Sequence, residues 1–375
     1  MSALPARTAT AEPADLPRLQ LEESREFRAY HEFLRAARQY MDGELVVAMH
    51  AKYQQAAANA PKPPTDAAAA TRLLDDLPQF QLYSWYFRHL QRFKYHRASL
   101  GIFAALDSQR QRLQSGLEAA VGLAGERLRL DPDLAIPDYF RFVPFHQHTG
   151  GVTHDALDGL AYELGRRTTV AQHADANNIY RLLFRMFPQR EYARVLDWGT
   201  GHGAALIDWQ RLHPQSECHG VDLSAPCLKL AHRRALENGM SLRFSQQDLE
   251  HLDYPDEHFD LVFFNFMLHE LPPRSLPALL AEARRVLKPG GLFAGHEFHL
   301  RPGDAFQNAL QHAHGWLNNE TYAVPWYDVP IAELARAAGF SGVRIEPFEA
   351  LIDSVIRPER RRASSSFWYY YEFTR

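Results

Sequence analysis

From about residue 190 onward, short apolar runs alternate with stretches of helical periodicity. The apolar runs are ARVLDWG, CHGVDLS, FDLVFFNF and GLFAGHEF, and the helical stretches include APCLKLAHRRALENG and LPALLAEARRVLKPGG. Chains with this alternation fold into a parallel sheet that is covered by helices. The pattern therefore predicts an α/β domain over residues 186–375, in which KPGG ends one helix before the next strand.

The first half of the chain has a different pattern, without alternating strands. Residues 1–20 are rich in alanine, proline and small polar residues, which predicts a flexible tail. Apolar side chains then recur at spacings of three and four residues, as in Phe27, Tyr30, Leu34, Ala37 and Met41. This periodicity is typical of helices that bury one face, so we expect an all-helical domain over residues 21–185.

Charge and composition narrow the partners that this chain can have. The formal net charge is −4 and the pI is about 6.6, which argues against a nucleic-acid partner. No apolar run approaches about 18 residues, and the first residues lack the apolar core of a secretory signal, so no membrane partner is expected. The two cysteines, Cys218 and Cys227, do not form a disulfide framework, which favours a cytoplasmic location.

The stretch VLDWGTGHGA, residues 195–204, places glycines at alternate positions directly after a predicted strand. Such glycines permit a tight turn and a close approach of the backbone to a ligand, and the pattern nearly matches a dinucleotide fingerprint. Asp197 argues against a dinucleotide, because its carboxylate would repel a pyrophosphate. The same carboxylate would suit a cofactor with a cationic amino-acid end.

Two further carboxylates lie near the ends of the following predicted strands. Asp222 ends the next strand, twenty-one residues after Gly201, where a carboxylate accepts hydrogen bonds from ribose hydroxyls. Asp248 lies before a proline-containing loop and can accept a bond from an adenine amino group. The three acidic side chains therefore favour a cofactor that combines an amino acid with a nucleoside.

These motifs, together with FDLVFFNFMLHEL and LLAEARRVLKPGG, resemble in order and spacing the class I S-adenosylmethionine-dependent methyltransferases over residues 190–300. The resemblance implies S-adenosyl-L-methionine as the cofactor and S-adenosyl-L-homocysteine as its product. It also implies a seven-stranded Rossmann-like sheet with helices on both faces and an antiparallel last strand. The C-terminal run FWYYYEFTR is well placed to form that strand.

The resemblance also implies the residues that bind the cofactor. They are Asp197, Gly199 and Gly201 for the methionine moiety, Asp222 for the ribose, Leu223, Asp248 and Leu249 around the adenine, and Asn265 and Phe266 at the end of the fourth strand. Trp198 departs from the family pattern, in which a small or apolar residue is commoner. We expect Trp198 to pack on the sheet.

The 19 histidines supply the candidates for the acceptor side of the site. His269 resembles the catalytic histidine of small-molecule O-methyltransferases that carry a helical N-terminal domain, although Glu270 stands where those enzymes often have aspartate. Residues 138–170 precede the sheet and are a candidate lid loop over the cofactor, or an ordinary surface loop. The candidate catalytic residues are His269 and His148, and the candidate substrate-binding residues are His146, His148, His299 and Tyr322, the last from the unusually polar stretch NNETY.

A metal site is a weaker interpretation of the same histidines. His269, His296, His299 and His314 could form a histidine and carboxylate site, but no close H-x-x-H spacing supports it, so we predict no metal. At the position of His269, a histidine without any acid–base role is also common in methyltransferases.

Taken together, the residues and the resemblance predict methyl transfer to a small molecule, with attack by oxygen or nitrogen of an aromatic or heteroaromatic metabolite. The alternatives are a metal-assisted C-methyltransferase of an α-keto acid, a protein methyltransferase, and a protein that binds the cofactor without methylating. We also expect a homodimer formed through the helical domain.

Overall fold

The structure is a computed structural model that describes residue 16 and residues 19–141, 143–169, 178–348 and 368–375. Most of the tail expected over residues 1–20 therefore lies outside the described residues. Among the helices that the structure describes, none is long and apolar enough to cross a membrane.

A single sheet forms the centre of the second half of the chain, with the strand order β1-β4-β3-β2-β5-β6-β8-β7. The strands are β1 Leu128–Arg129, β2 Arg194–Trp198, β3 Glu217–Asp222, β4 Arg243–Gln246, β5 Phe259–Asn265, β6 Leu287–Phe298, β7 Gly342–Pro347 and β8 Trp368–Thr374. Strands β1 to β6 pair in parallel, and β8 pairs antiparallel with both β6 and β7. The predicted Rossmann-like α/β class and the antiparallel last strand are confirmed.

The sheet differs from the expectation in one respect, because it has eight strands instead of seven. The additional strand is β1, a two-residue segment from the region that was expected to be entirely helical. Leu128 and Arg129 pair with Phe244 and Ser245 at the free edge of β4. Two residues leave too little periodicity to be recognised in a sequence.

Two helical layers cover the sheet. The helices of this half are α10 Ala204–Leu212, α11 Ala225–Glu237, α12 Leu276–Val286, α13 Ala305–Asn318, α14 Ala323–Trp326 and α15 Ile331–Ala337. On β2, Val195 faces a core under α10 and α11, whereas Leu196 and Trp198 face a second core under α12 and α15. Trp198 is fully buried there, with its ring centroid 5.0 Å from that of Phe293, which confirms its packing role.

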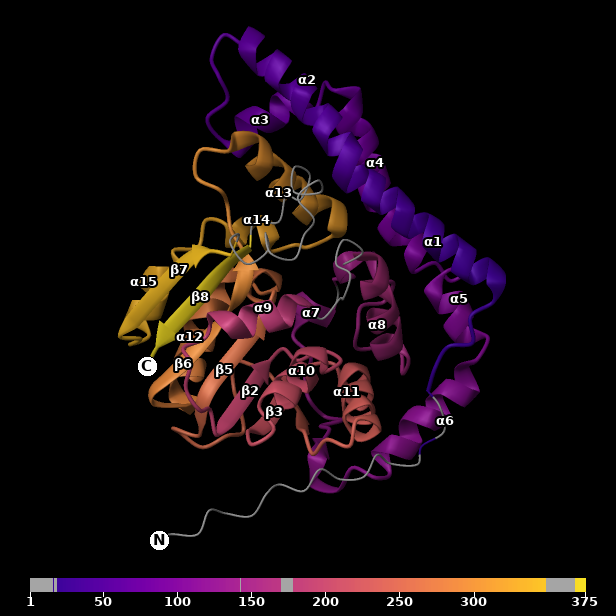
Figure 1. Ribbon diagram of the computed structural model, residues 1–375, viewed down its shortest axis with the longest axis vertical. Helices are drawn as coiled ribbons and strands as arrows, with labels where there is room; N and C mark the ends of the chain where they lie inside the picture. The colour runs from indigo at the N-terminus through magenta and orange to yellow at the C-terminus, as the bar shows by residue number, and fades with distance from the viewer. Residues whose placement is uncertain (1–15, 17–18, 142, 170–177, 349–367) are drawn as a thin grey trace.

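The first helices of the chain form an arm along one side of the α/β part (Figure 1). They are α1 Arg25–Tyr40, the π-helical turn η1 Met41–Leu45, α2 Val46–Asn59, α3 Ala67–Leu74, α4 Pro78–Lys94, α5 Ile102–Asp107 and α6 Arg110–Val121. The helices α7 Asp138–Arg141, α8 Asp158–Thr169 and α9 Asn178–Met186 follow the arm in the chain, and α8 packs against α11 while α9 packs against α10. The Ser24 side chain accepts a hydrogen bond from Phe27 N and so caps α1, whose Phe27 and Leu34 are buried.

The arm contacts the α/β part at two separate places. Near one end, α3 and α4 pack against α13, where Phe87 and Phe306 belong to one apolar cluster. Near the other end, α6 packs against α11. There the buried Arg233 donates hydrogen bonds to Gly116 O in α6 and to Glu237 in its own helix.

We expect Arg233→Met to lower the free energy of unfolding by about 1.5–3 kcal/mol, because it keeps the apolar bulk but removes buried, charge-assisted hydrogen bonds. Lys229→Ala is the matched control, since Lys229 joins the same two helices through a more exposed ion pair with Glu118. That pair should contribute at most about 1 kcal/mol. Chemical denaturation measures both variants, and equal losses would contradict the role given to Arg233.

Candidate functional site

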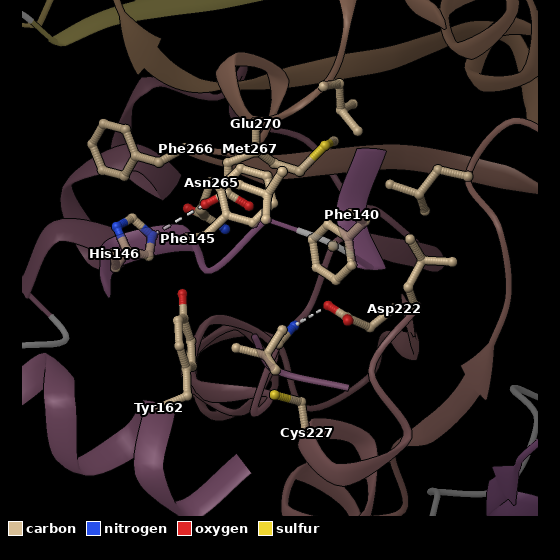
Figure 2. Close-up of a pocket in the computed structure, with 17 residues that line it drawn as sticks. Phe140, Phe145, His146, Tyr162, Asp222, Cys227, Asn265, Phe266, Met267 and Glu270 are labelled. Carbon is tan, nitrogen blue, oxygen red and sulfur yellow. Dashed lines mark hydrogen bonds and ion pairs between the residues drawn. The ribbon is translucent and has the colours of Figure 1, made fainter. Parts of the chain in front are cut away.

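A pocket of about 890 Å³, including its open mouth, lies where the carboxyl ends of β2, β3 and β5 meet the segment that joins α7 to α8. Its walls combine the glycine turn with apolar and aromatic side chains (Figure 2). It is lined by Phe140, Val143, Phe145, His146, Val152, Tyr162, Gly199, Gly201, Asp222, Leu223, Cys227, Leu249, Asn265, Phe266, Met267, Glu270 and Leu271. The lining therefore comes both from the helical half of the chain and from the α/β half.

The turn after β2 forms one wall of the pocket and requires glycine. Gly199, Gly201 and Gly203 have φ angles of 76°, 53° and 77°, a region that other residues rarely adopt. At Gly203 an added Cβ would lie 2.9 Å from Ala231 Cβ, and at Gly201 it would point toward the ring of Tyr162 at 3.6 Å. The tight turn predicted from the sequence is present, and its open side faces the pocket.

Asp222 ties the ends of β2 and β3 together beside this turn. Its Oδ2 accepts a hydrogen bond from Gly201 N at 2.8 Å, and its Oδ1 accepts one from Ser224 N at 2.8 Å. Burial raises the pKa of the Asp222 carboxyl to about 6, although these backbone donors oppose the shift. The backbone N–H of Leu223 adds a third donor, and the carboxylate can still accept a further bond from a ligand.

Asp197 is buried at the end of β2, behind the lining of the pocket. Its Oδ2 accepts a hydrogen bond from Thr200 Oγ1 at 2.7 Å, whereas Oδ1 has no hydrogen-bond partner among the described residues. Burial raises the pKa of Asp197 to about 7. A buried carboxylate oxygen without a partner is costly, which is consistent with a polar group of a ligand bonding to it.

The other predicted cofactor residues divide into two groups. Leu223, Leu249, Asn265 and Phe266 line the pocket, as the resemblance implies. Asp248 does not line it, and the Asp248 carboxylate accepts a hydrogen bond from Glu250 N. Phe266 has a φ of 47°, so a non-glycine residue at the pocket wall adopts a strained backbone conformation.

The candidate residues for the acceptor side also fall into two groups, those that line the pocket and those that do not. His146 lines the pocket, but His148, His299 and Tyr322 do not. His148 lies between the rings of Tyr95 and Phe103, and burial lowers its pKa to about 3. The His299 ring lies 2.9 Å from the Tyr371 hydroxyl, at hydrogen-bond distance. Tyr322 packs near Tyr139, with ring centroids 6.3 Å apart.

His269 is buried in η4 (Leu268–Glu270) just behind the pocket wall. Its Nδ1 lies 2.7 Å from Glu297 Oε1, and its Nε2 lies 3.6 Å from Glu320 Oε2. Burial alone would lower the pKa of His269, but the carboxylates of Glu297 and Glu320 outweigh burial and raise it to about 9. Glu297 is therefore the carboxylate that fixes the orientation of the His269 ring.

Glu320 is a further buried residue whose connection to the site the sequence did not indicate. Its side chain is completely buried, and its Oε1 lies 3.1 Å from His146 Nδ1, while Oε2 lies 3.3 Å from His314 Nδ1. Burial would raise the pKa of Glu320, but His314 and His146 outweigh burial and lower it. The only signal in the sequence was the polar stretch NNETY, from which we had singled out Tyr322.

The histidines do not gather into a metal centre within the part of the chain that the structure describes. No group of three or more histidine, cysteine, aspartate or glutamate side chains there has an arrangement that could hold a metal ion. His296 is buried, its two ring nitrogens lack hydrogen-bond partners among the described residues, and its ring stacks on Phe266 at 4.1 Å between centroids.

Known proteins share the segment that carries the glycine turn. A family model described as a methyltransferase domain matches residues 195–291. A demethylmenaquinone methyltransferase of Deinococcus radiodurans is 38% identical over 165 residues, which is 39% of this chain and 67% of that protein. This chain belongs to the class I S-adenosylmethionine-dependent methyltransferases.

Further methyltransferases are similar to this chain. A demethylmenaquinone methyltransferase of Thermus thermophilus is 36% identical over 118 residues, which is 30% of this chain and 50% of that protein. The chain spans about half the length of the curated relatives it matches. Human N-acetylserotonin methyltransferase, solved in complex with S-adenosylmethionine, is 14% identical, with a TM-score of 0.46 over 95% of this chain and 99% of that one.

The residues of this methyltransferase fit the family's cofactor. The left-handed glycine turn leaves room for close approach of a ligand, and the Asp222 carboxylate beside it can accept a further bond from a hydroxyl donor. Behind this turn, Asp197 Oδ1 lacks a hydrogen-bond partner among the described residues and suits a cationic group. Leu223 and Leu249 add apolar surface for a flat ring.

We expect Asp222→Ala to weaken S-adenosylhomocysteine binding by about 1.5–3 kcal/mol, because charge-assisted bonds to the ribose are lost. Since burial raises the pKa of Asp222 to about 6, the carboxylate becomes neutral below that pH, and affinity of the parent protein should fall as pH drops through 6. Calorimetry between pH 5 and 8 measures this. Asp133→Ala, at an exposed position, is the control, and unchanged binding by Asp222→Ala would refute the assignment.

Proposed function

We propose that this chain transfers the methyl group of S-adenosyl-L-methionine to a small-molecule acceptor, an oxygen or nitrogen of an aromatic or heteroaromatic compound. The observation that carries the proposal is the composition of the pocket. Its lining holds the glycine turn and Asp222, with Tyr162 of α8 beside Gly201, and Phe140 and Phe145 of the helical half add two further aromatic rings. An aromatic acceptor can stack on such side chains.

The proposed cofactor contacts follow the order of the strands. Gly199, Gly201 and Asp197 hold the methionine moiety, Asp222 binds the ribose hydroxyls, and Leu223 and Leu249 enclose the adenine with Asp248 at its edge. Asn265 and Phe266 lie at the end of β5, where the cofactor and the acceptor meet. The bound cofactor supplies a methyl group already activated on a sulfonium. The chain's own task is therefore to align the acceptor, exclude water and accommodate a proton.

We further propose His269 as the group that receives the acceptor's proton. Glu297 holds Nδ1 at 2.7 Å and fixes the ring, which leaves Nε2 without a hydrogen-bond partner among the described residues. This arrangement has the elements of a base and an orienting carboxylate. Because His269 lies behind the pocket wall, its contact with an acceptor requires a small shift of η4.

We expect His269→Ala to lower kcat by about 10²–10⁴-fold while leaving S-adenosylmethionine affinity nearly unchanged. Because the carboxylates raise the pKa of His269 to about 9 and a base must be unprotonated, kcat of the parent enzyme should rise with pH up to about 9. Single-turnover rates and melting temperatures are measured on both proteins. A lower melting temperature with an unchanged single-turnover rate would leave His269 with a structural role alone.

The acceptor class is tested by incubating the purified protein and S-adenosylmethionine with cell extract divided into small-molecule and macromolecular fractions. We expect S-adenosylhomocysteine release with the small-molecule fraction, since the pocket is enclosed by aromatic side chains. Release with the macromolecular fraction alone would instead favour a protein acceptor. Loss of activity with EDTA and its return with added metal would favour the metal-assisted alternative.

We also propose a homodimer formed through the helical arm. Phe33, Tyr40 and Val47 are exposed along the continuous helical run from α1 through η1 to α2. Exposed apolar side chains of this size are candidates for a contact between two copies of the chain. Trp85, on α4, is exposed as well. Light scattering of the purified protein measures its mass. The cytoplasmic location is proposed on the two cysteines, which are free and buried.

A further inference from the structure

Glu270 is the one acidic side chain of the pocket lining that lies apart from the proposed ribose contact. Its Oε1 lies 3.2 Å from His146 Nε2, and its Oε2 has no hydrogen-bond partner among the described residues. The Glu270 side chain is 22% exposed, so this second oxygen is open to the pocket and not sealed in the core. Figure 2 shows the His146–Glu270 bond, with Tyr162 below it in the view and the Tyr162 hydroxyl directed toward it.

His146 holds the Glu270 carboxylate in place and does not itself offer a free nitrogen. Its Nε2 faces Glu270, and its Nδ1 lies 3.1 Å from the buried Glu320. The backbone of His146 has a φ of 55° and that of Gln147 a φ of 58°, so two successive non-glycine residues are strained beside the pocket. Strain of this kind persists where the surroundings fix a side chain in a required position.

The rest of the lining is suited to a positive charge. Phe140, Phe145, Tyr162 and Phe266 present aromatic rings, whose faces attract cations. Asn265 adds a buried Oδ1 that lacks a partner among the described residues and can accept an N–H bond. Among the described residues that line the pocket there is no lysine or arginine to pair with an anionic acceptor.

We propose that Glu270, positioned by His146, selects methyl acceptors that carry a cationic amine next to an aromatic ring. The ammonium would donate to Glu270 Oε2 and Asn265 Oδ1, while the ring would stack on the aromatic wall. An acceptor that carries a carboxylate in the same place would be repelled and would leave these acceptor atoms unpaired. This inference rests on the proposed function, because it assumes that the pocket holds the acceptor beside the cofactor.

Three probes with the same ring separate charge from shape: tryptamine is cationic, tryptophol is neutral and indole-3-acetate is anionic. Calorimetry with the S-adenosylhomocysteine complex of the full chain should give affinities in that order. Glu270→Gln should weaken tryptamine binding about 10- to 100-fold, through loss of a charge-assisted bond, and change tryptophol binding far less. Glu333→Gln, which removes an exposed carboxylate on α15, should behave as the parent.

The positioning role of His146 is tested in the same assay. His146→Gln retains a donor for Glu270 and should keep most of the preference for tryptamine over tryptophol, whereas His146→Leu should lose it. A merely structural role would lower the melting temperature of both variants and leave the ratio of the two affinities unchanged. Equal ratios in the parent and in His146→Leu would therefore overturn this part of the inference.

The binding of S-adenosylhomocysteine itself shows whether the proposed function or only the acceptor preference has failed. If S-adenosylhomocysteine itself does not bind, the proposed function fails. If it binds but tryptamine binds no better than indole-3-acetate, or no probe binds, the inference alone fails. If Glu270→Gln weakens S-adenosylmethionine but not the neutral S-adenosylhomocysteine, Glu270 faces the sulfonium, and the proposed acceptor contact is wrong.

Discussion

The parallel pairing of β2 between β3 and β5 is the constraint on which the rest of the structure depends. Because the three strands run in the same direction, Asp197, Asp222 and Asn265 arrive at one edge of the sheet from distant parts of the chain. The left-handed turn after β2 then reverses the backbone without covering that edge. Only glycine permits this at no steric cost, so the sequence pattern and the site geometry have the same cause.

A second constraint is the burial of charge behind the pocket. Glu297 and Glu320 are fully buried, and isolated carboxylates at such depth would be strongly destabilising. His269, His146 and His314 lie against them and offset the loss of hydration. This cluster joins η4, the end of α13 and the segment before α8. Replacing any one member would leave a buried partner uncompensated, so the cluster is a further link between the segment before α8 and the α/β part.

The parts of the fold with strong periodicity could be predicted from the sequence. The strands around Asp197 and Asp222, the glycine turn and the antiparallel aromatic strand follow from apolar runs and turn residues within a few positions of one another. By contrast, β1 has only two residues and forms because the edge of β4 is available to it. Such a strand is created by tertiary contact and has no local signal.

The acceptor side of the site was harder to predict, for a related reason. A histidine in a polar loop can face a ligand or pack in a core, and its sequence neighbours do not distinguish the two. His146 and His148 are two residues apart, yet one lines the pocket and the other lies between two aromatic rings of the arm. Glu320 reaches the site only because α13 ends beside η3 (Phe145–Gln147), a contact between residues far apart in the chain.

The two separate attachments of the arm limit how small molecules can enter and leave. A hinge-like swing of the whole arm would have to break the apolar cluster at α13 and the Arg233 bonds at α11 together. The stretch between α7 and α8 is held as well, because His146 lies against Glu270 and Glu320, Gln147 donates to Leu317 O, and Ser224 donates to Val152 O. The arm, this stretch and the sheet are therefore linked parts, and any opening of the pocket wide enough for an aromatic compound has to break several of these contacts at once.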